Sequence, residues 1–377
     1  MLRNIFLKLH QKGISWVFWR LSQEIRNPSN PRLRRGIDGF LSLRRRCIHL
    51  IFPPRTDSLL YAIYDLDVNA ITYNLIEFLI DSELESKRRG KLGFVVVFVP
   101  YSYDARRSWQ EYDSVIDSEN KAWRFQNILL PLTALSEHCK GVNVLPSRSS
   151  APEFAKSHEV YPTEYDGLNL RSIDTVRLWT ELDRANMFDG LRATRQGLRY
   201  ISTWQSESEA TGPVVTITIR NHAFDRARNS DIPEWVKFAH YLRSAGYHPV
   251  IIPDTDTAFS KLSPFEGLCE FKECAWNVML RTALYESAFL NLFVPNGCAS
   301  LCFFNPRSRY ICMNMLPAGS IVTTEESYKK HGLEIGASWK FAAAGQRLSF
   351  RPDTFENILA EFEDFVDEFG SGMQHLD

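Results

Sequence analysis

The pattern of apolar and polar positions along the chain predicts two α/β domains with a more polar stretch between them. Runs rich in β-branched and aromatic residues predict strands at 58–64, 92–99, 141–145, 214–219, 289–294 and 310–313. Helical periodicity recurs between these runs, most clearly at 70–85, 118–138 and 275–287. The run at 214–219 has no polar face, which favours a parallel strand that is buried on both sides. Alternating strands and helices of this kind predict Rossmann-like domains.

These elements divide the chain into five parts. They are a basic amphipathic arm at 1–55, an N-terminal Rossmann-like domain at 56–165, a linker and helical segment at 166–211, a C-terminal Rossmann-like domain at 212–350 and a closing helix at 351–377. The Ser- and Glu-rich residues 202–211 are expected to form the linker itself. Residues 327–347 show neither helical nor strand periodicity.

The loop after the predicted strand at 214–219 carries the most distinctive chemistry. In open parallel sheets, ligands bind beyond the carboxyl ends of the strands, and this loop lies at such an end. A helix predicted to start near Asp231 would add the free N–H groups of its first turn. The residues expected to contact a ligand here are Arg220, Arg226, Arg228, Asn229 and Ser230. Three arginines favour a phosphate group, although any one of them could pair with a nearby carboxylate instead.

A second loop follows the predicted strand at 289–294. Asn296 and Gly297 form a turn directly after that strand, where glycine would let the backbone approach a ligand closely. Such turns are also common as purely structural features. Because both loops lie at strand ends of one predicted domain, we expect them to face one crevice.

The N-terminal residues carry an excess of positive charge. The whole chain has a net charge of −1, but residues 1–55 contain 12 Lys and Arg against Glu24 and Asp38, a local charge of +10. The aromatic and aliphatic residues among these charges would let residues 1–50 lie on an anionic membrane surface, or the arm could pack on the acidic body of the protein. Because the excess positive charge is confined to the arm, nucleic-acid binding is not expected.

The lengths of the apolar runs and the spacing of the cysteines argue against several classes of protein and site. No apolar run approaches the ~20 residues that cross a bilayer, and no signal-peptide core follows the basic residues, so a cytoplasmic protein is expected, with peripheral attachment to the inner face of the membrane as an option. The seven cysteines contain no CxxC pair, which argues against a disulfide framework or a structural zinc site.

The two loop segments, IRNHAFDRARNSDIPEW and FVPNGCASL, resemble the donor-binding segments of GT-B-type glycosyltransferases, and the first is similar to the arginine-bearing donor loop of fucosyltransferase-like members. The resemblance covers about a quarter of the chain. It implies two Rossmann-like domains that face each other, with a nucleotide-sugar held mainly by the second. Arg220, Arg226 and Arg228 would then neutralise the donor diphosphate without a metal ion. Asn296 and Gly297 would contact the donor, and Glu286 or Asp254 would accept hydrogen bonds from ribose or sugar hydroxyls.

An inverting transferase also needs a base for the attacking hydroxyl. Asp65 and Asp67 follow the first predicted strand and are the main candidates, although aspartates are also common there as caps. His222 in the arginine loop competes with them, as base or as phosphate contact. Both Asp65-Leu66-Asp67 and Asp254-Thr255-Asp256 have the spacing of a metal-binding DxD pair, but neither context requires a metal, and none is assigned.

The sequence therefore predicts a metal-independent, inverting glycosyltransferase that moves a sugar from a nucleotide-sugar to a cell-surface polysaccharide or lipid-linked acceptor, with no further cofactor. Two alternatives remain open. A nucleotide-sugar epimerase or hydrolase would keep the fold and change the reaction. A non-catalytic binding subunit of a polysaccharide assembly complex would use the arm as its partner interface.

Overall fold

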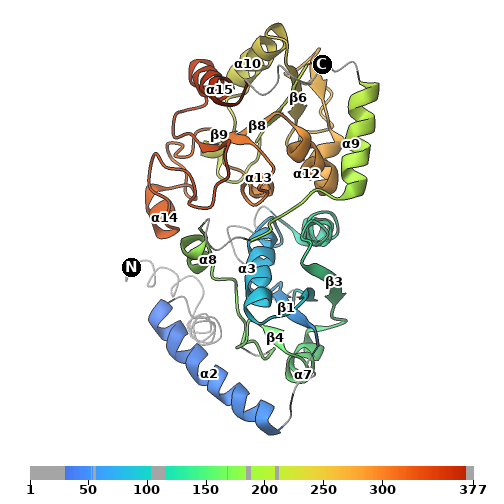
Figure 1. Cartoon of the computed structure of the whole chain (residues 1–377), viewed down its shortest axis with the longest axis vertical. Coiled ribbons are helices and arrows are strands. Elements are labelled where there is room, and N and C mark those ends of the chain that lie inside the picture. The colour runs from blue at the N-terminus through green and yellow to red at the C-terminus, as the bar shows by residue number, and fades with distance from the viewer. Residues whose placement is uncertain are drawn as a thin grey trace. The chain divides into compact units, whose positions relative to one another are not determined.

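The computed structural model describes residues 30–51, 53, 57–102, 116–167, 169–183, 188–208 and 212–370. They form two compact units (Figure 1). The first unit comprises Met1–Ile71, Phe78–Ser114 and His138–Ile173, and the second comprises Thr72–Glu77, Val115–Glu137 and Asp174–Asp377. The first 29 residues of the predicted arm lie outside the described residues.

The first unit is built on a parallel four-stranded sheet in the order β3-β2-β1-β4. Its strands are β1 (Leu59–Asp65), β2 (Gly93–Val99), β3 (Cys139–Val144) and β4 (Val160–Tyr161). Its helices are α2 (Pro31–Ile51), α3 (Leu75–Arg88), which begins in the second unit, and α7 (Ala151–Ser157), preceded by the short turn η3 (Arg148–Ser150). The strands at the centre of the sheet, β1 and β2, are almost fully buried, as their apolar sequences predict.

The second unit contains a parallel six-stranded sheet in the order β10-β9-β8-β5-β6-β7. The strands are β5 (Val214–Thr218), β6 (His248–Ile252), β7 (Cys269–Glu270), β8 (Leu290–Phe293), β9 (Tyr310–Cys312) and β10 (Gln346–Leu348). The longer helices are α9 (Arg195–Glu207), α10 (Ile232–Ser244), α12 (Val278–Ser287) and α15 (Phe355–Phe369). Shorter ones are α5 (Ser118–Arg124), η2 (Phe125–Leu129), α6 (Leu130–Thr133), α8 (Thr175–Glu181), η4 (Arg226–Arg228), α11 (Glu273–Trp276), η5 (Gly297–Ala299), α13 (Ser300–Phe303) and α14 (Glu325–Lys330).

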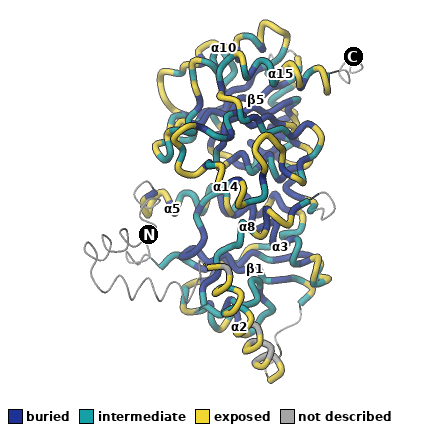
Figure 2. Tube along the Cα trace, turned by 90° about the vertical axis from the view of Figure 1, so that its left-hand side faces the viewer, coloured by how far each residue is buried: buried dark blue, intermediate teal, exposed yellow. Residues whose placement is uncertain are grey.

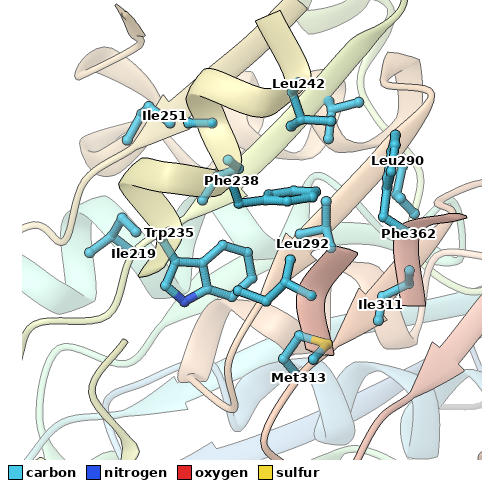
Figure 3. Packing of buried hydrophobic residues seen from close by; sticks show 14 of the residues in the cluster. Ile219, Trp235, Phe238, Leu242, Ile251, Leu290, Leu292, Ile311, Met313 and Phe362 are labelled. Carbon is cyan, nitrogen blue, oxygen red and sulfur yellow. The ribbon is translucent and has the colours of Figure 1, made fainter. Parts of the chain in front are cut away.

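Strand β5 at the centre of this sheet is buried along its whole length (Figure 2). Successive side chains of a strand point to opposite faces, and β5 shows both. Val215 and Ile217 join the core beneath α10 and α15, whereas the hydroxyl of Thr218 lies 2.7 Å from that of Tyr285 on α12. The core beneath α10 and α15 centres on Trp235, Phe238 and Phe362 (Figure 3). It fixes α10, and therefore the loop that leads into it.

The structure differs from the sequence-based expectations in three segments. The segment 202–207, expected as linker, forms the last turns of α9, because its Ser and Glu residues occupy the solvent side of a helix whose Ile201 is fully buried. Residues 116–137, expected in the first domain, cluster with the second unit. The segment 327–347, without periodicity, includes the last four residues of α14 and two of the three residues of β10. A strand that short is too brief to show an alternating pattern.

In the described part of the chain, no helix combines the length and the apolar character needed to cross a bilayer.

Candidate functional site

The arginine loop is closed at its base by a reciprocal pair of hydrogen bonds. The backbone N–H of Arg220 donates to the Ser230 hydroxyl at 3.0 Å, and the Ser230 N–H donates to the Arg220 carbonyl at 3.0 Å. Residues 221–229 therefore form a compact excursion between β5 and α10. Ser230 is buried and serves to close this loop.

The guanidinium of Arg220 is held entirely by neutral oxygens. Its Nη1 donates to the Asp225 carbonyl at 3.1 Å and to Asn229 Oδ1, and its Nη2 donates to the Phe224 carbonyl. Arg220 is only 5% exposed. Burial, together with the positive charge of Arg228, lowers the pKa of Arg220 to about 10, so the side chain stays charged at neutral pH. Among the described residues, no carboxylate lies within ion-pair distance of it.

The other two predicted arginines differ from Arg220. Arg228 is neutralised, because its Nε lies 3.0 Å from Asp225 Oδ2. The Asp225 carboxylate also accepts a 2.7 Å hydrogen bond from the Ser320 hydroxyl. Arg226 is exposed, and its side chain has no polar partner among the described residues. Only Arg220 is thus a buried cation without a counter-ion in this loop.

Asn229 and His222 shape the loop around Arg220. Asn229 Oδ1 accepts from the His222 N–H at 3.1 Å, and Asn229 Nδ2 donates to the His222 carbonyl at 3.2 Å. His222 Nδ1 accepts from the Phe224 N–H at 3.0 Å. Burial lowers the pKa of His222, so its ring is neutral at pH 7 and carries its proton on Nε2. In this tautomer His222 can donate a hydrogen bond to a ligand, but its only basic nitrogen is already occupied.

Asp254 connects two strand ends at the same edge of the sheet. Its Oδ2 accepts from the Asn221 N–H at 3.0 Å, so the loop after β6 is tied to the loop after β5. The Asp254 side chain is partly exposed. Its predicted contact with a hydroxyl group is compatible with this place and stays a prediction.

Asn296 and Gly297 lie at the carboxyl end of β8. The Asn296 side chain is used locally, because Oδ1 accepts from the Ala299 N–H at 2.8 Å and Nδ2 donates to the Val294 carbonyl at 2.8 Å. A Cβ at Gly297 would lie 3.0 Å from the ring of Tyr73. The missing side chain therefore admits Tyr73, a residue that sequence analysis did not select.

The structure does not bring Glu286 to the arginine loop. Glu286 is at the carboxyl end of α12, and that end precedes the start of β8, at the opposite edge of the sheet from the arginine loop. Its Oε2 accepts from the Ala193 N–H at 2.8 Å and from Asn305 Nδ2 at 3.0 Å, and its Oε1 accepts from Arg307 at 3.2 Å. Glu286 is thus a structural anchor.

The aspartates after β1 belong to the first unit and share Arg148. Each oxygen of Asp65 accepts two hydrogen bonds, Oδ1 from the Asp67 N–H at 2.9 Å and from Arg148 at 2.8 Å, and Oδ2 from Arg148 at 2.9 Å and from Tyr165 at 2.8 Å. These four bonds fill the lone pairs of the Asp65 carboxylate. Asp67 lies 3.3 Å from Arg148 Nε and accepts from the Ser102 N–H at 2.8 Å. Asp65 is therefore a structural residue, and Asp67 is the remaining carboxylate candidate for a base.

Replacing Glu286 tests this reassignment. We expect Glu286→Ala to lower the free energy of unfolding by roughly 2–4 kcal/mol, because the Ala193 N–H and the Asn305 amide lose their acceptor. Nucleotide affinity should stay within about twofold of wild type. Urea denaturation and calorimetric titration measure the two quantities, with Glu325→Ala on the exposed face of α14 as the control. Lost nucleotide binding at unchanged stability would restore Glu286 to the site.

No protein-family model matches this sequence, and no curated protein matches it. Among the solved structures that are similar in fold are two glycosyltransferases. ADP-heptose LPS heptosyltransferase II of E. coli aligns with a TM-score of 0.50 and 11% identity, over 82% of this chain and 99% of that one. A family 9 glycosyl transferase of Veillonella parvula aligns with a TM-score of 0.51 and 8% identity, over 82% of this chain and 97% of that one.

At such low identity the likeness concerns the fold alone. It confirms the prediction of a GT-B-type α/β fold with two Rossmann-like units. The two similar proteins are a heptosyltransferase and a family 9 enzyme, so the likeness to fucosyltransferase-like donor loops stays a prediction. The chain has the fold of GT-B-type glycosyltransferases.

Proposed function

We propose that this protein is a glycosyltransferase that takes its sugar from a nucleotide-sugar donor. The observation that carries the proposal is Arg220, a buried guanidinium held only by neutral oxygens at the carboxyl end of the central strand β5. An uncompensated buried charge is costly, and a bound anion offsets that cost. The GT-B-type fold supports a nucleotide-sugar as the source of that anion.

Arg220 would act on the leaving group. When the bond between sugar and diphosphate breaks, negative charge builds on the departing phosphate oxygen. A preorganised cation at that point stabilises the transition state more than the ground state. The neutral oxygens that hold Arg220 orient it without cancelling its charge. We propose that this supplies the stabilisation that a metal ion would otherwise give, with no further cofactor.

Asp67 is the proposed base. The geometry of His222 favours a hydrogen-bond donor, and Asp65 has no lone pair left to take a proton. Asp67 would accept the proton of the acceptor hydroxyl as that oxygen attacks the anomeric carbon. Attack opposite to the leaving diphosphate inverts the configuration at that carbon, and we propose this outcome.

The acceptor is proposed to be lipid-linked or part of a cell-surface polysaccharide, because α2 offers a surface suited to a membrane. Its outward stripe is apolar, with exposed fractions of 47% for Leu33, 69% for Phe40, 61% for Leu43 and 85% for Leu50. This spacing of seven, three and seven residues keeps the four side chains on one helix face. We call it the α2 stripe.

The other face of α2 holds the helix on the first unit. Arg34 donates to the Ser172 carbonyl at 2.9 Å, and Asp38 lies 2.8 Å from the buried Arg171. The one acidic side chain of α2 is therefore used for docking, while Arg32, Arg35 and Arg44 surround the α2 stripe as exposed residues. Apolar and basic groups together suit an anionic lipid surface. We propose peripheral attachment to the cytoplasmic face of a membrane.

The donor site is tested by thermal unfolding with UDP-, GDP-, ADP-, CMP- and dTDP-sugars. A ligand at 100 times its dissociation constant should add roughly 2.7 kcal/mol of stability. We expect one nucleotide class to stabilise the wild-type protein and not Arg220→Gln. Arg243→Gln, at the exposed end of α10, is the matched control and should respond as wild type does. Stabilisation that survives in Arg220→Gln would contradict the proposed site, and no stabilisation by any donor would favour the non-catalytic subunit.

Asp67→Asn tests the base. We expect kcat for sugar transfer to fall by about 100-fold or more, because the attacking hydroxyl loses its proton acceptor, while donor binding is retained. Product analysis in the same assay separates transfer from epimerisation and hydrolysis. A variant that transfers sugar at the wild-type rate would remove Asp67 from the mechanism.

The membrane proposal is tested by co-sedimentation with vesicles. Wild-type protein should bind vesicles that contain anionic phospholipid, bind zwitterionic vesicles poorly, and lose binding as salt is raised. The double variant Phe40→Glu and Leu43→Glu should bind at least several-fold less. Leu262→Glu, at a residue 87% exposed in the second unit, is the control. Equal binding by the double variant would exclude the α2 stripe as the lipid contact.

A further inference from the structure

Arg281 lies at the same edge of the second sheet as the arginine loop, although it comes from a different element. Helix α12 starts at Val278, where the Asn277 side chain accepts from the N–H groups of Met279 and Leu280 at 3.0 and 3.1 Å. The helix runs back toward the start of β8, and its 10 residues span about 15 Å. Its first turn, which carries Arg281, is therefore near the carboxyl ends of the strands.

The Arg281 side chain is buried and mostly unpaired. Arg281 is 4% exposed, and its Nε donates to the Cys274 carbonyl at 2.6 Å. A guanidinium has five N–H donors, so four remain on the two terminal nitrogens. Those nitrogens have no hydrogen-bond partner, and Arg281 has no carboxylate within 4 Å, in the ranges that the structure describes. Arg281 is thus a second buried cation without a counter-ion.

Arg220 and Arg281 share one neighbour in the loop after β8. Both interact electrostatically with Cys298, which follows Gly297 in the loop after β8. The Cys298 thiol donates a hydrogen bond to Asn296 Oδ1 at 2.9 Å. Tyr285, one turn beyond Arg281, lies 2.7 Å from Thr218 at the end of β5, two residues before Arg220. Both guanidinium groups therefore lie near Cys298 at the carboxyl ends of β5 and β8, and we call this place the basin.

Two further residues complete the basin. Tyr73 packs on Gly297 and interacts electrostatically with Arg281, Cys298, Arg124 and Asp254. Burial raises the pKa of Tyr73 to about 12, so its hydroxyl is a hydrogen-bond donor at neutral pH. Arg124 at the end of α5 bonds to Asn120 at 3.1 Å, and among the described residues it has no carboxylate partner.

The net charge of the fixed groups in this basin suits an anionic ligand. Arg124, Arg220 and Arg281 contribute three positive charges, and Asp254 contributes one negative charge, which leaves +2. Arg228 and Asp225 cancel each other. The diphosphate bridge of a nucleotide-sugar carries two negative charges. The residual charge therefore suits a doubly charged phosphate group, such as this bridge, better than a neutral sugar.

We infer that Arg281 is a second diphosphate-binding residue of the donor site, with its terminal nitrogens on one phosphate while Arg220 holds the other. Arg124 adds positive charge to the basin, and the Tyr73 hydroxyl donates to the same anion. This inference rests on the proposed function only in naming the diphosphate as part of a nucleotide-sugar. It assigns binding to a residue on α12, outside both loops that carry the sequence motifs.

Calorimetric titration with inorganic pyrophosphate tests the inference, because this probe needs neither the base nor the sugar. We expect Arg281→Gln to weaken pyrophosphate binding by about 10–100-fold, as loss of a charge-assisted contact predicts. Arg281→Lys keeps the charge and should lose less. Arg124→Gln, at a half-buried side chain, should lose a smaller factor and provides a second variant if Arg281→Gln does not fold. Thermal unfolding without ligand shows which variants are folded.

The outcomes separate this inference from the proposed function. If a folded Arg281→Gln binds pyrophosphate as tightly as wild type while Arg220→Gln does not, the inference is overturned and the donor site stands. A folded Arg281→Gln that loses pyrophosphate more than it loses an uncharged nucleoside supports it. If the wild-type protein binds neither pyrophosphate nor any nucleoside diphosphate, the proposed function fails together with the inference.

Discussion

The constraint on which this account depends is the cost of burying a positive charge without a negative partner. The Arg220 guanidinium donates hydrogen bonds to three neutral oxygens of its own loop, and these bonds offset part of the cost. Neutral acceptors orient a guanidinium but leave its field uncancelled. The hydrogen bond from Arg220 to Ser230 closes the loop, and the two hydrogen bonds between Asn229 and His222 brace it. Together they hold this charge in place. Such a site is preorganised for an anion.

The parallel sheet determines which residues can share that site. Parallel strands end at one edge of the sheet, so the loops after β5, β6 and β8 lie at the same edge. The hydrogen bond from Asn221 to Asp254 joins the first two of these loops. The same rule separates Glu286 from them, because the end of α12 returns to the other edge. It also brings the first turn of α12 to the site, and with it Arg281. The order and direction of the strands therefore determine which of these polar residues lie near the site.

The sequence predicted the strand-helix alternation, the central strand β5 and the importance of the loop that follows it. These succeeded because buried parallel strands and amphipathic helices have strong local patterns. It could not rank the three arginines, since the pairing of Arg228 with Asp225 depends on a folded loop. Arg281 and Tyr73 were missed for a related reason. Each sits within a helix or turn whose pattern indicates packing, and only tertiary contacts bring them to Cys298.

The central claim is that the second unit binds a diphosphate at the carboxyl end of β5. A crystal structure of the protein with a bound nucleoside diphosphate tests this most directly. The account predicts phosphate oxygens within hydrogen-bond distance of the Arg220 guanidinium, with the diphosphate over the loop that contains Gly297. A diphosphate bound elsewhere, with Arg220 still enclosed only by its own loop, would contradict it.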